Sequence, residues 1–180
     1  PTGMLVYEGS LLPQQYYGQM IHCEPGLNVV RSYPVSKNGA GYKASISNIL
    51  HDDDDQWFRP ADVSAAPDGS IMIADWYDPG VGGHGAGDQD RGRIFRVAPT
   101  ASIYRIPKLD LITPRGAVAA LQSPNLATRY LAFTALLAMG DKAIPSLEAL
   151  WHSKADPRMR ARALWVLSKF QSGKKILMKH

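Results

Sequence analysis

The strongest constraint on the fold is the uneven distribution of helix-breaking residues along the chain. Gly and Pro interrupt residues 1–100 so often that no long segment there keeps the 3.6-residue apolar period of a helix. Short alternating or wholly apolar runs take its place, for example at 27–35 and 94–97. Helical periodicity is found only in the second half of the chain. The sequence therefore predicts a β-rich first part and an α-helical second part.

One hairpin is indicated by its turn. Pro67, Asp68 and Gly69 separate two strand-like runs, 62–66 and 70–75; Pro presets φ and Gly accepts a positive φ. A third strand, 91–97, follows after a long Gly-rich loop. Three short antiparallel strands of this kind are typical of one blade of a β-propeller.

The order of these strands predicts where their loops meet. In a propeller blade the chain enters the innermost strand from one rim, and the loop between the second and third strands returns to that rim. Residues 51–60 and 76–90 are therefore expected to lie on one face.

The second half has the apolar periodicity of amphipathic helices. The longest segment spans 126–139, with Ser123 expected as its N-cap, Pro124 at its first position and Gly140 at its end. Shorter helices are expected over 144–151 and from Asp156 onward.

Two helix starts resemble each other. Pro124 is followed five residues later by Arg129, and Pro157 five residues later by Arg162, which gives a spacing of 33 residues. Spacings of this size indicate stacked helix pairs that bury their faces against neighbours. The predicted domains are 1–99 (partial β-propeller blades), 100–114 (a Pro-interrupted linker) and 115–180 (partial HEAT-like repeats).

Composition supports two parts and excludes several classes of function. Residues 1–99 carry 7 Lys and Arg against 12 Asp and Glu, a net charge of −5, whereas residues 100–180 carry 13 against 4, a net charge of +9. No base-stacking aromatic pattern accompanies the basic part, so no nucleic acid is expected as a partner. Cys23 is the only cysteine, which excludes an internal disulfide and a Cys-pair metal or haem motif.

The Gly-rich loop and its flanks hold most of the candidate chemistry. Three interpretations compete for it. His84 is a general base with a carboxylate such as Asp75 orienting its ring, or Asp78, Asp88 and Asp90 ligate a metal ion, or these side chains are structural. A general base in this position would remove a proton from a substrate hydroxyl group.

Three further features have both a functional and a structural interpretation. The acidic run 52–55 is either a Ca²⁺ site or a solvated loop. Arg59 is either an anion clamp, since guanidinium binds carboxylates bidentately, or the partner of that acidic run. The aromatic residues are either a sugar-stacking platform or packing between blades. They are Trp57, Phe58, Trp76 and Tyr77.

The motifs occur in an order that resembles a known family. They are Trp57–Pro60, Asp62–Val63, Ala66–Ser70, Ala74–Pro79, Gly82–His84 and Gly92–Val97, with Tyr7–Gly9, Leu12–Pro13 and Tyr16–Gly18 before them. This string is similar to the membrane-bound dehydrogenase-like proteins of planctomycetes and verrucomicrobia. Those are exported chains with a propeller similar to glucose/sorbosone dehydrogenases, then HEAT-like repeats, and often a cytochrome c domain. The resemblance implies that this chain is an internal piece of such a protein.

The resemblance also implies a cofactor and a location. In soluble quinoprotein sugar dehydrogenases an Arg before an Asp-Val and a Pro-Asp-Gly turn contacts pyrroloquinoline quinone (PQQ), and Arg59 matches that position. Ala61 stands where some relatives have a second Arg. The implied location is the periplasm or another exported compartment, with membrane association only of the full-length protein. Haem would lie in a domain outside this chain.

Three functions follow as hypotheses. The first is a PQQ-dependent dehydrogenase that oxidises a sugar or polyol and passes electrons to a cytochrome c-type domain or protein. The second is a non-catalytic propeller and HEAT scaffold that binds carbohydrate or protein. The third is a metal-dependent hydrolase on the same propeller.

Overall fold

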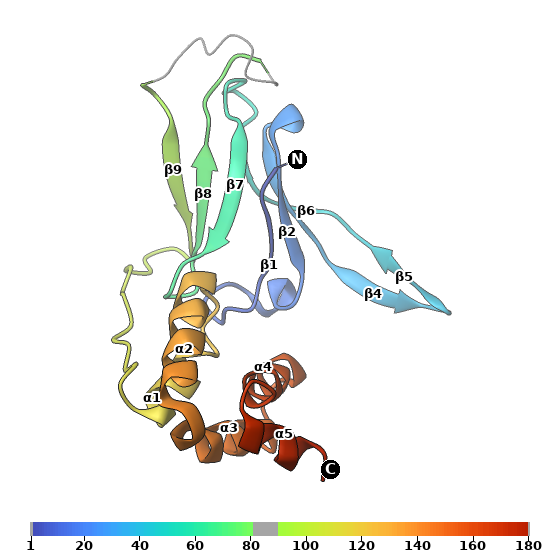
Figure 1. The fold of residues 1–180 in the computed structure, drawn as a ribbon. Coiled ribbons are helices and arrows are strands. Elements are labelled where there is room, and N and C mark those ends of the chain that lie inside the picture. Colours follow the sequence, from blue (N-terminus) through green and yellow to red (C-terminus); the bar gives the residue numbers. More distant parts are fainter. Residues whose placement is uncertain (1, 81–89, 180) are drawn as a thin grey trace. The chain divides into compact units, whose positions relative to one another are not determined.

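The computed structural model describes residues 2–80 and 90–179. The chain divides into two compact units, residues 1–105 and residues 106–180. The first consists of antiparallel sheets and the second of α-helices (Figure 1). The predicted order, β-rich and then α-helical, is therefore confirmed.

The first sheet of the β unit has four antiparallel strands in the order β1-β2-β3-β6. Its strands are β1 (Met4–Val6), β2 (Met20–Glu24), β3 (Val29–Tyr33) and β6 (Ser47–His51). A hairpin of β4 (Val35–Asn38) and β5 (Gly41–Ala44) is inserted between β3 and β6 and extends away from the sheets (Figure 1).

The second sheet has the order β7-β8-β9. Its strands are β7 (Pro60–Ala65), β8 (Ile71–Asp75) and β9 (Arg93–Val97). Gly69 closes the β7–β8 turn with a φ of +89°, and Asp68 accepts hydrogen bonds from the backbone N–H and the hydroxyl of Ser70 at 2.9 and 2.6 Å. The hairpin predicted from Pro67, Asp68 and Gly69 is confirmed.

One apolar core joins the two sheets. Strands β1 and β2 pack against β7, and the fully buried side chains come from both sheets, among them Ile21, Val30 and Ile73. Tyr7 is buried with them; its hydroxyl donates to the Gly69 carbonyl at 2.6 Å and accepts from the Leu12 N–H at 3.0 Å. This side chain fixes the turn of the second sheet to the segment that follows β1.

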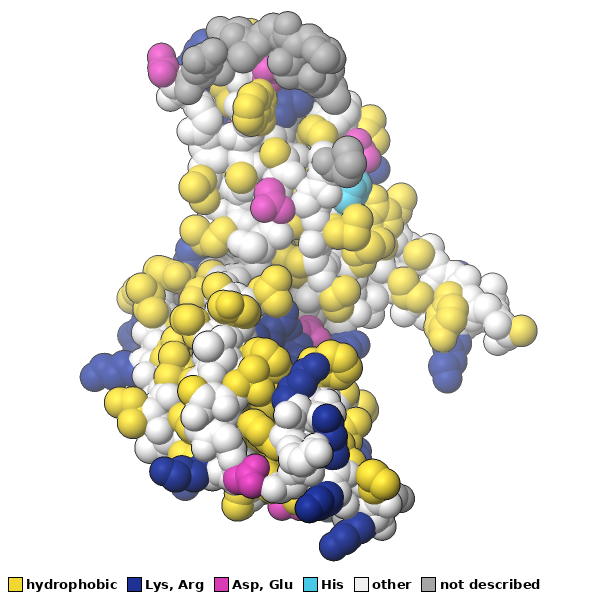
Figure 2. Space-filling model, viewed as in Figure 1, with side chains coloured by type: hydrophobic (Ala, Val, Ile, Leu, Met, Phe, Trp, Pro, Cys, Tyr) yellow, Lys and Arg dark blue, Asp and Glu magenta, His cyan; other side chains and the backbone are white. Residues whose placement is uncertain are grey.

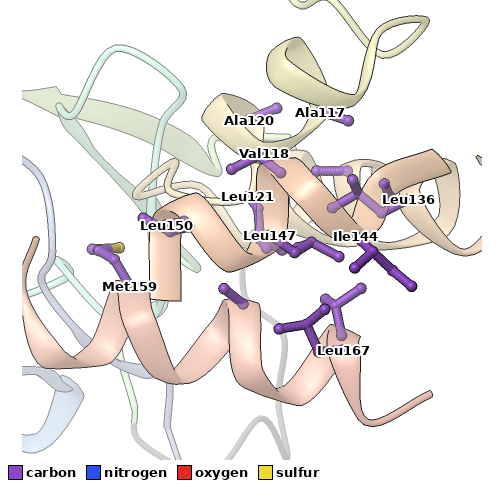
Figure 3. Packing of buried hydrophobic residues seen from close by; sticks show 14 of the residues in the cluster. Ala117, Val118, Ala120, Leu121, Leu136, Ile144, Leu147, Leu150, Met159 and Leu167 are labelled. Carbon is purple, nitrogen blue, oxygen red and sulfur yellow. The ribbon is translucent and has the colours of Figure 1, made fainter. Parts of the chain in front are cut away.

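The helical unit has its own core. Its helices are α1 (Pro114–Ala120), α2 (Leu126–Met139), α3 (Ile144–Trp151), α4 (Pro157–Leu167) and α5 (Gln171–Leu177). Figure 3 shows side chains from α2, α3 and α4 converging between the helices, among them Leu136, Leu147 and Leu167, each fully buried. On the face shown in Figure 2, separate Lys and Arg side chains lie among hydrophobic ones on this unit, in keeping with its net positive charge.

The start of α2 corrects the prediction made from Ser123 and Pro124. The N-cap is Asn125, whose side-chain oxygen accepts the Thr128 N–H at 2.8 Å, and the helix begins at Leu126. Asn is as good an N-cap as Ser, because its oxygen reaches the same free donor. Gly140 does end the helix, with a φ of +58°, as predicted.

Antiparallel sheets followed by five helices are thus established for the described residues. A closed ring of blades and a helical repeat are finer interpretations of the same arrangement. Within residues 2–80 and 90–179, no helix has the length and apolar character needed to cross a membrane.

Candidate functional site

The candidate site lies at one end of the second sheet. Arg59 precedes β7, Asp75 ends β8 and Arg93 begins β9. The backbone hydrogen bonding between β7 and β8 continues past the ends of both strands. The Trp76 N–H donates to the Arg59 carbonyl at 2.9 Å, and the Asp78 N–H donates to the Trp57 carbonyl at 3.1 Å. The prediction that segments 51–60 and 76–90 meet is confirmed for the part of them that the structure describes.

Asp75 holds this end of the sheet together. Its side chain is fully buried, and one carboxylate oxygen accepts the N–H groups of Arg59 and Tyr77 at 2.7 and 3.0 Å. The other oxygen accepts from Arg93 Nε at 2.8 Å and lies 2.7 Å from its Nη2. A buried carboxylate that accepts this many hydrogen bonds is held in one orientation and fixes the groups that donate to it. The geometry therefore favours a positioning role for Asp75.

Arg93 connects Asp75 to the acidic run. Its Nη2 lies 2.9 Å from the Asp55 carboxylate, and its guanidinium lies over the Tyr77 ring at 4.2 Å from the centroid. Burial by itself would lower the pKa of Arg93, but the hydrogen bonds to Asp75 and Asp55 outweigh burial and raise it. The three residues form one ion-pair network across the strand ends.

The acidic run has a structural role in the described structure. The Asp52 carboxylate accepts the N–H groups of Asp54 and Asp55, each at 3.0 Å, and therefore caps its own turn. Asp53 lies 3.4 Å from His51. Among the described residues, no group of three or more His, Cys, Asp or Glu is arranged to hold a metal ion.

Arg59 is bound by carbonyl groups, and the expected alternative of an ion pair with the acidic run is not observed among the described residues. Its Nη1 donates to the carbonyls of Pro25 and Phe58 and its Nη2 to that of Pro79, all at 3.3 Å. Its Nε is buried and has no hydrogen-bond partner in the described part of the chain. A guanidinium without a carboxylate, with one donor unused, fits the charge and the donor needs of a carboxylate ligand.

The four aromatic residues divide into two kinds. Phe58 is 2% exposed and packs edge-on against Phe95, with 5.7 Å between ring centroids. The ring centroids of Trp57 and Tyr77 lie 5.6 Å apart, and the Arg91 guanidinium lies over both rings. These contacts lie within the second sheet and its flanks, whereas the structural interpretation predicted packing between blades. Trp76 differs, because 57% of it is exposed.

Asp78 is also engaged by N–H donors. It is 3% exposed, and its two oxygens accept from Trp76 Nε1 at 3.1 Å and from the Gly80 N–H at 2.8 Å. His84 and Asp88 lie outside the described residues, whereas Asp90 is described and exposed. The metal site predicted from Asp78, Asp88 and Asp90, and the base role of His84, therefore stay predictions.

Sequence analysis singled out Arg59 and Asp75. It did not predict the hydrogen bond between them, nor the ion pairs of Asp75 and Asp55 with Arg93. The Asp55–Arg93–Asp75 network links three segments that are far apart in the chain, and no short motif encodes it. The pair Trp76 and Asp78 had a local signal, since side chains two residues apart can meet across a turn.

Comparison with known proteins identifies one family. No curated protein and no solved structure matches the chain. The model of a family described as a domain of unknown function (DUF7133) matches residues 1–101, which is more than half of the chain and covers both sheets of the β unit. The chain therefore belongs to the DUF7133 family.

Proposed function

We propose that this chain is part of an exported quinoprotein-like dehydrogenase that oxidises a sugar or polyol, with Arg59 as the cofactor contact. The observation that carries the proposal is the Arg59 guanidinium at the strand ends, with carbonyl partners, no described carboxylate and an unused Nε. The electrons would pass to a cytochrome c-type domain or protein outside this chain.

The arrangement of the β unit supports its interpretation as propeller blades. In both sheets, strands that follow one another in the chain pair antiparallel, apart from the inserted β4–β5 hairpin. The first strands of the two sheets, β1 and β7, pack against each other, as the inner strands of neighbouring blades would.

Burial in the helical unit supports the interpretation as HEAT-like repeats. The buried positions Thr128, Ala132 and Leu136 of α2 correspond to Met159, Ala163 and Leu167 of α4. Their N-caps are Asn125 and Asp156. All four pairs are 31 residues apart, whereas Pro124 and Pro157 are 33 residues apart. A regular spacing of equivalent buried faces is the property that lets helix pairs stack.

Each residue of the site has a distinct part in the proposed reaction. The chemistry that PQQ supplies when bound is two-electron oxidation of the substrate's hydroxyl-bearing carbon. Arg59 would bind a cofactor carboxylate through its guanidinium. Asp75 fixes the backbone of Arg59 through the 2.7 Å hydrogen bond and so positions that side chain. His84 would remove the hydroxyl proton of the substrate.

PQQ binding tests the proposal directly. The protein is titrated with PQQ by calorimetry, alongside Arg59→Ala and the control Arg105→Ala, which removes an exposed Arg of the same unit. We expect Arg59→Ala to weaken binding by about tenfold or more, because a hydrogen bond to a charged group contributes about 1.5–3 kcal/mol. Absence of saturable binding, or equal affinity of the wild type and Arg59→Ala, refutes the cofactor role.

A second candidate is a carbohydrate- or protein-binding scaffold without catalysis. The hydrogen bonds of Asp75 and Asp78 favour it, because every oxygen of both carboxylates already accepts from a protein N–H, which is the pattern of a structural role. This candidate predicts saturable glycan binding without dye reduction in the presence of PQQ. Dye reduction that is lost in Arg59→Ala would exclude it.

A further inference from the structure

Trp76 combines exposure with a fixed orientation. Its side chain is 57% exposed, yet its indole Nε1 donates to Asp78 Oδ2 at 3.1 Å. Asp78 is itself 3% exposed, and its Oδ1 is held by the Gly80 N–H. Because the only polar group of the indole is already satisfied, the flat faces of the ring are what it offers to a ligand.

The backbone around Trp76 is strained in a way that serves this arrangement. Tyr77, the next residue, has a φ of +54°, a conformation that is costly for a bulky side chain. The Tyr77 N–H is held by Asp75 at 3.0 Å, which stabilises the turn. The Trp76 N–H donates to the Arg59 carbonyl, so the two residues lie opposite each other just beyond the ends of β8 and β7.

Trp165 shows by comparison that exposure alone does not make such a site. It is 62% exposed on α4, but the ammonium group of Lys169 lies 4.3 Å from the centroid of its ring. One face of that indole is therefore already covered by a cation. Trp165 provides a matched control for a tryptophan of similar exposure in the other unit.

We propose that the Trp76 indole is a stacking platform for the apolar face of a pyranose ring, and that Asp78 is the positioning residue that holds it. A gluco-configured pyranose has equatorial hydroxyl groups, so its two faces present C–H groups, which pack well on an aromatic face. The inference rests on the proposed function to the extent that it names a carbohydrate contact at the same end of the sheet. It does not require bound PQQ.

Calorimetric titration with cellotetraose tests this assignment. The wild type is compared with Trp76→Ala, Trp76→Phe and the control Trp165→Ala. We expect Trp76→Ala to weaken binding about tenfold, the effect of losing one stacked ring. Trp76→Phe keeps a flat face but loses the bond to Asp78, and we expect its affinity to lie between those of the wild type and Trp76→Ala. Trp165→Ala is expected to bind as the wild type does.

Asp78→Asn separates positioning from folding. It keeps an oxygen for the Gly80 N–H but turns an amide donor toward Trp76 Nε1. We expect weaker binding although the indole is still present, with a far-UV circular dichroism spectrum equal to that of the wild type. An unchanged affinity in Asp78→Asn with an intact fold overturns the positioning role.

The results also distinguish this proposal from the proposed function. Cellotetraose binding that depends on Trp76, together with no PQQ binding, supports the platform and refutes the cofactor role. PQQ binding that depends on Arg59, with cellotetraose binding absent or unaffected by Trp76→Ala, overturns the platform alone.

Discussion

Substitution of Asp75 by Asn measures how much the strand-end network stabilises the β unit. The introduced amide would keep one oxygen for the N–H groups of Arg59 and Tyr77, but it would place a donor where Asp75 now accepts from Arg93. Removal of one partner of a buried ion pair costs about 3–5 kcal/mol. Arg93 is 38% exposed and keeps Asp55, so solvent and the second carboxylate reduce the expected loss to about 2 kcal/mol.

Cys23 provides an assay that reports on this unit alone. It is fully buried in the core shared by the two sheets, and it is the only thiol in the chain. Burial raises its pKa to about 12, so the folded protein should react slowly with thiol reagents near pH 8. Labelling of Cys23 against temperature then gives the unfolding midpoint of the β unit. A loss of about 2 kcal/mol corresponds to a decrease in the midpoint of about 8 °C for a unit of this size.

Asp55→Asn is the matched control for this experiment. It removes the other carboxylate of the network, but Asp55 is 22% exposed whereas the Asp75 side chain is fully buried. We expect a loss of about 1 kcal/mol or less, within the range of partly exposed ion pairs. In an Arg93→Met background the effect of Asp75→Asn should shrink, because the two residues interact directly. A midpoint decrease for Asp75→Asn that is no larger than for Asp55→Asn refutes the reasoning.

Two further predictions concern a helix cap and a turn. Asn125→Ala should destabilise the helical unit by about 1 kcal/mol, because it removes the N-cap of α2. Ser123→Ala should have the smaller effect on the free energy of unfolding. Urea unfolding followed by circular dichroism measures both, and a larger effect of Ser123→Ala would identify Ser123 as the cap. The second concerns Asp68. Burial by itself would raise the pKa of Asp68, but hydrogen bonds from Ser70 and Arg96 outweigh it and lower the pKa below its ordinary value. The stabilisation by Asp68 is therefore fully present above about pH 4 and is lost as the pH falls through the lowered pKa. The thermal unfolding midpoints of the wild type and Asp68→Asn, followed by circular dichroism, should differ at about pH 6 and converge toward about pH 2; a constant difference contradicts this.

Local signals predicted local structure well. The turn at Pro67–Gly69 and the helix end at Gly140 depend on backbone conformations that only a few residue types adopt, and both were predicted correctly. The start of α2 was wrong because Ser123 and Asn125 are both good caps. Apolar periodicity shows that a helix exists but does not decide between two caps that lie two residues apart.

The candidate site was harder to predict because its decisive contacts are not local. Arg59 and the acidic run are close in sequence, which made an ion pair between them a reasonable expectation. Asp55 instead pairs with Arg93, 38 residues away, because the β7–β8–β9 register brings the start of β9 to the same end of the sheet as the start of β7. The assignment of a carboxylate as base, ligand or brace depends on such long-range partners, which a single sequence does not contain.

Asp75 and Asp78 show that an acidic residue predicted as a catalytic group or a metal ligand can instead hold its neighbours in place by hydrogen bonds. Asp75 and Asp78 flank the dipeptide Trp76-Tyr77, and both were candidates for chemistry. In the structure each oxygen of both carboxylates accepts at least one N–H, so together they fix the backbone of Arg59 and the ring of Trp76. Buried carboxylates with such internal partners hold the groups around them in fixed positions. The two ligand contacts that we propose, the Arg59 guanidinium and the Trp76 indole face, belong to the residues that these carboxylates hold in place.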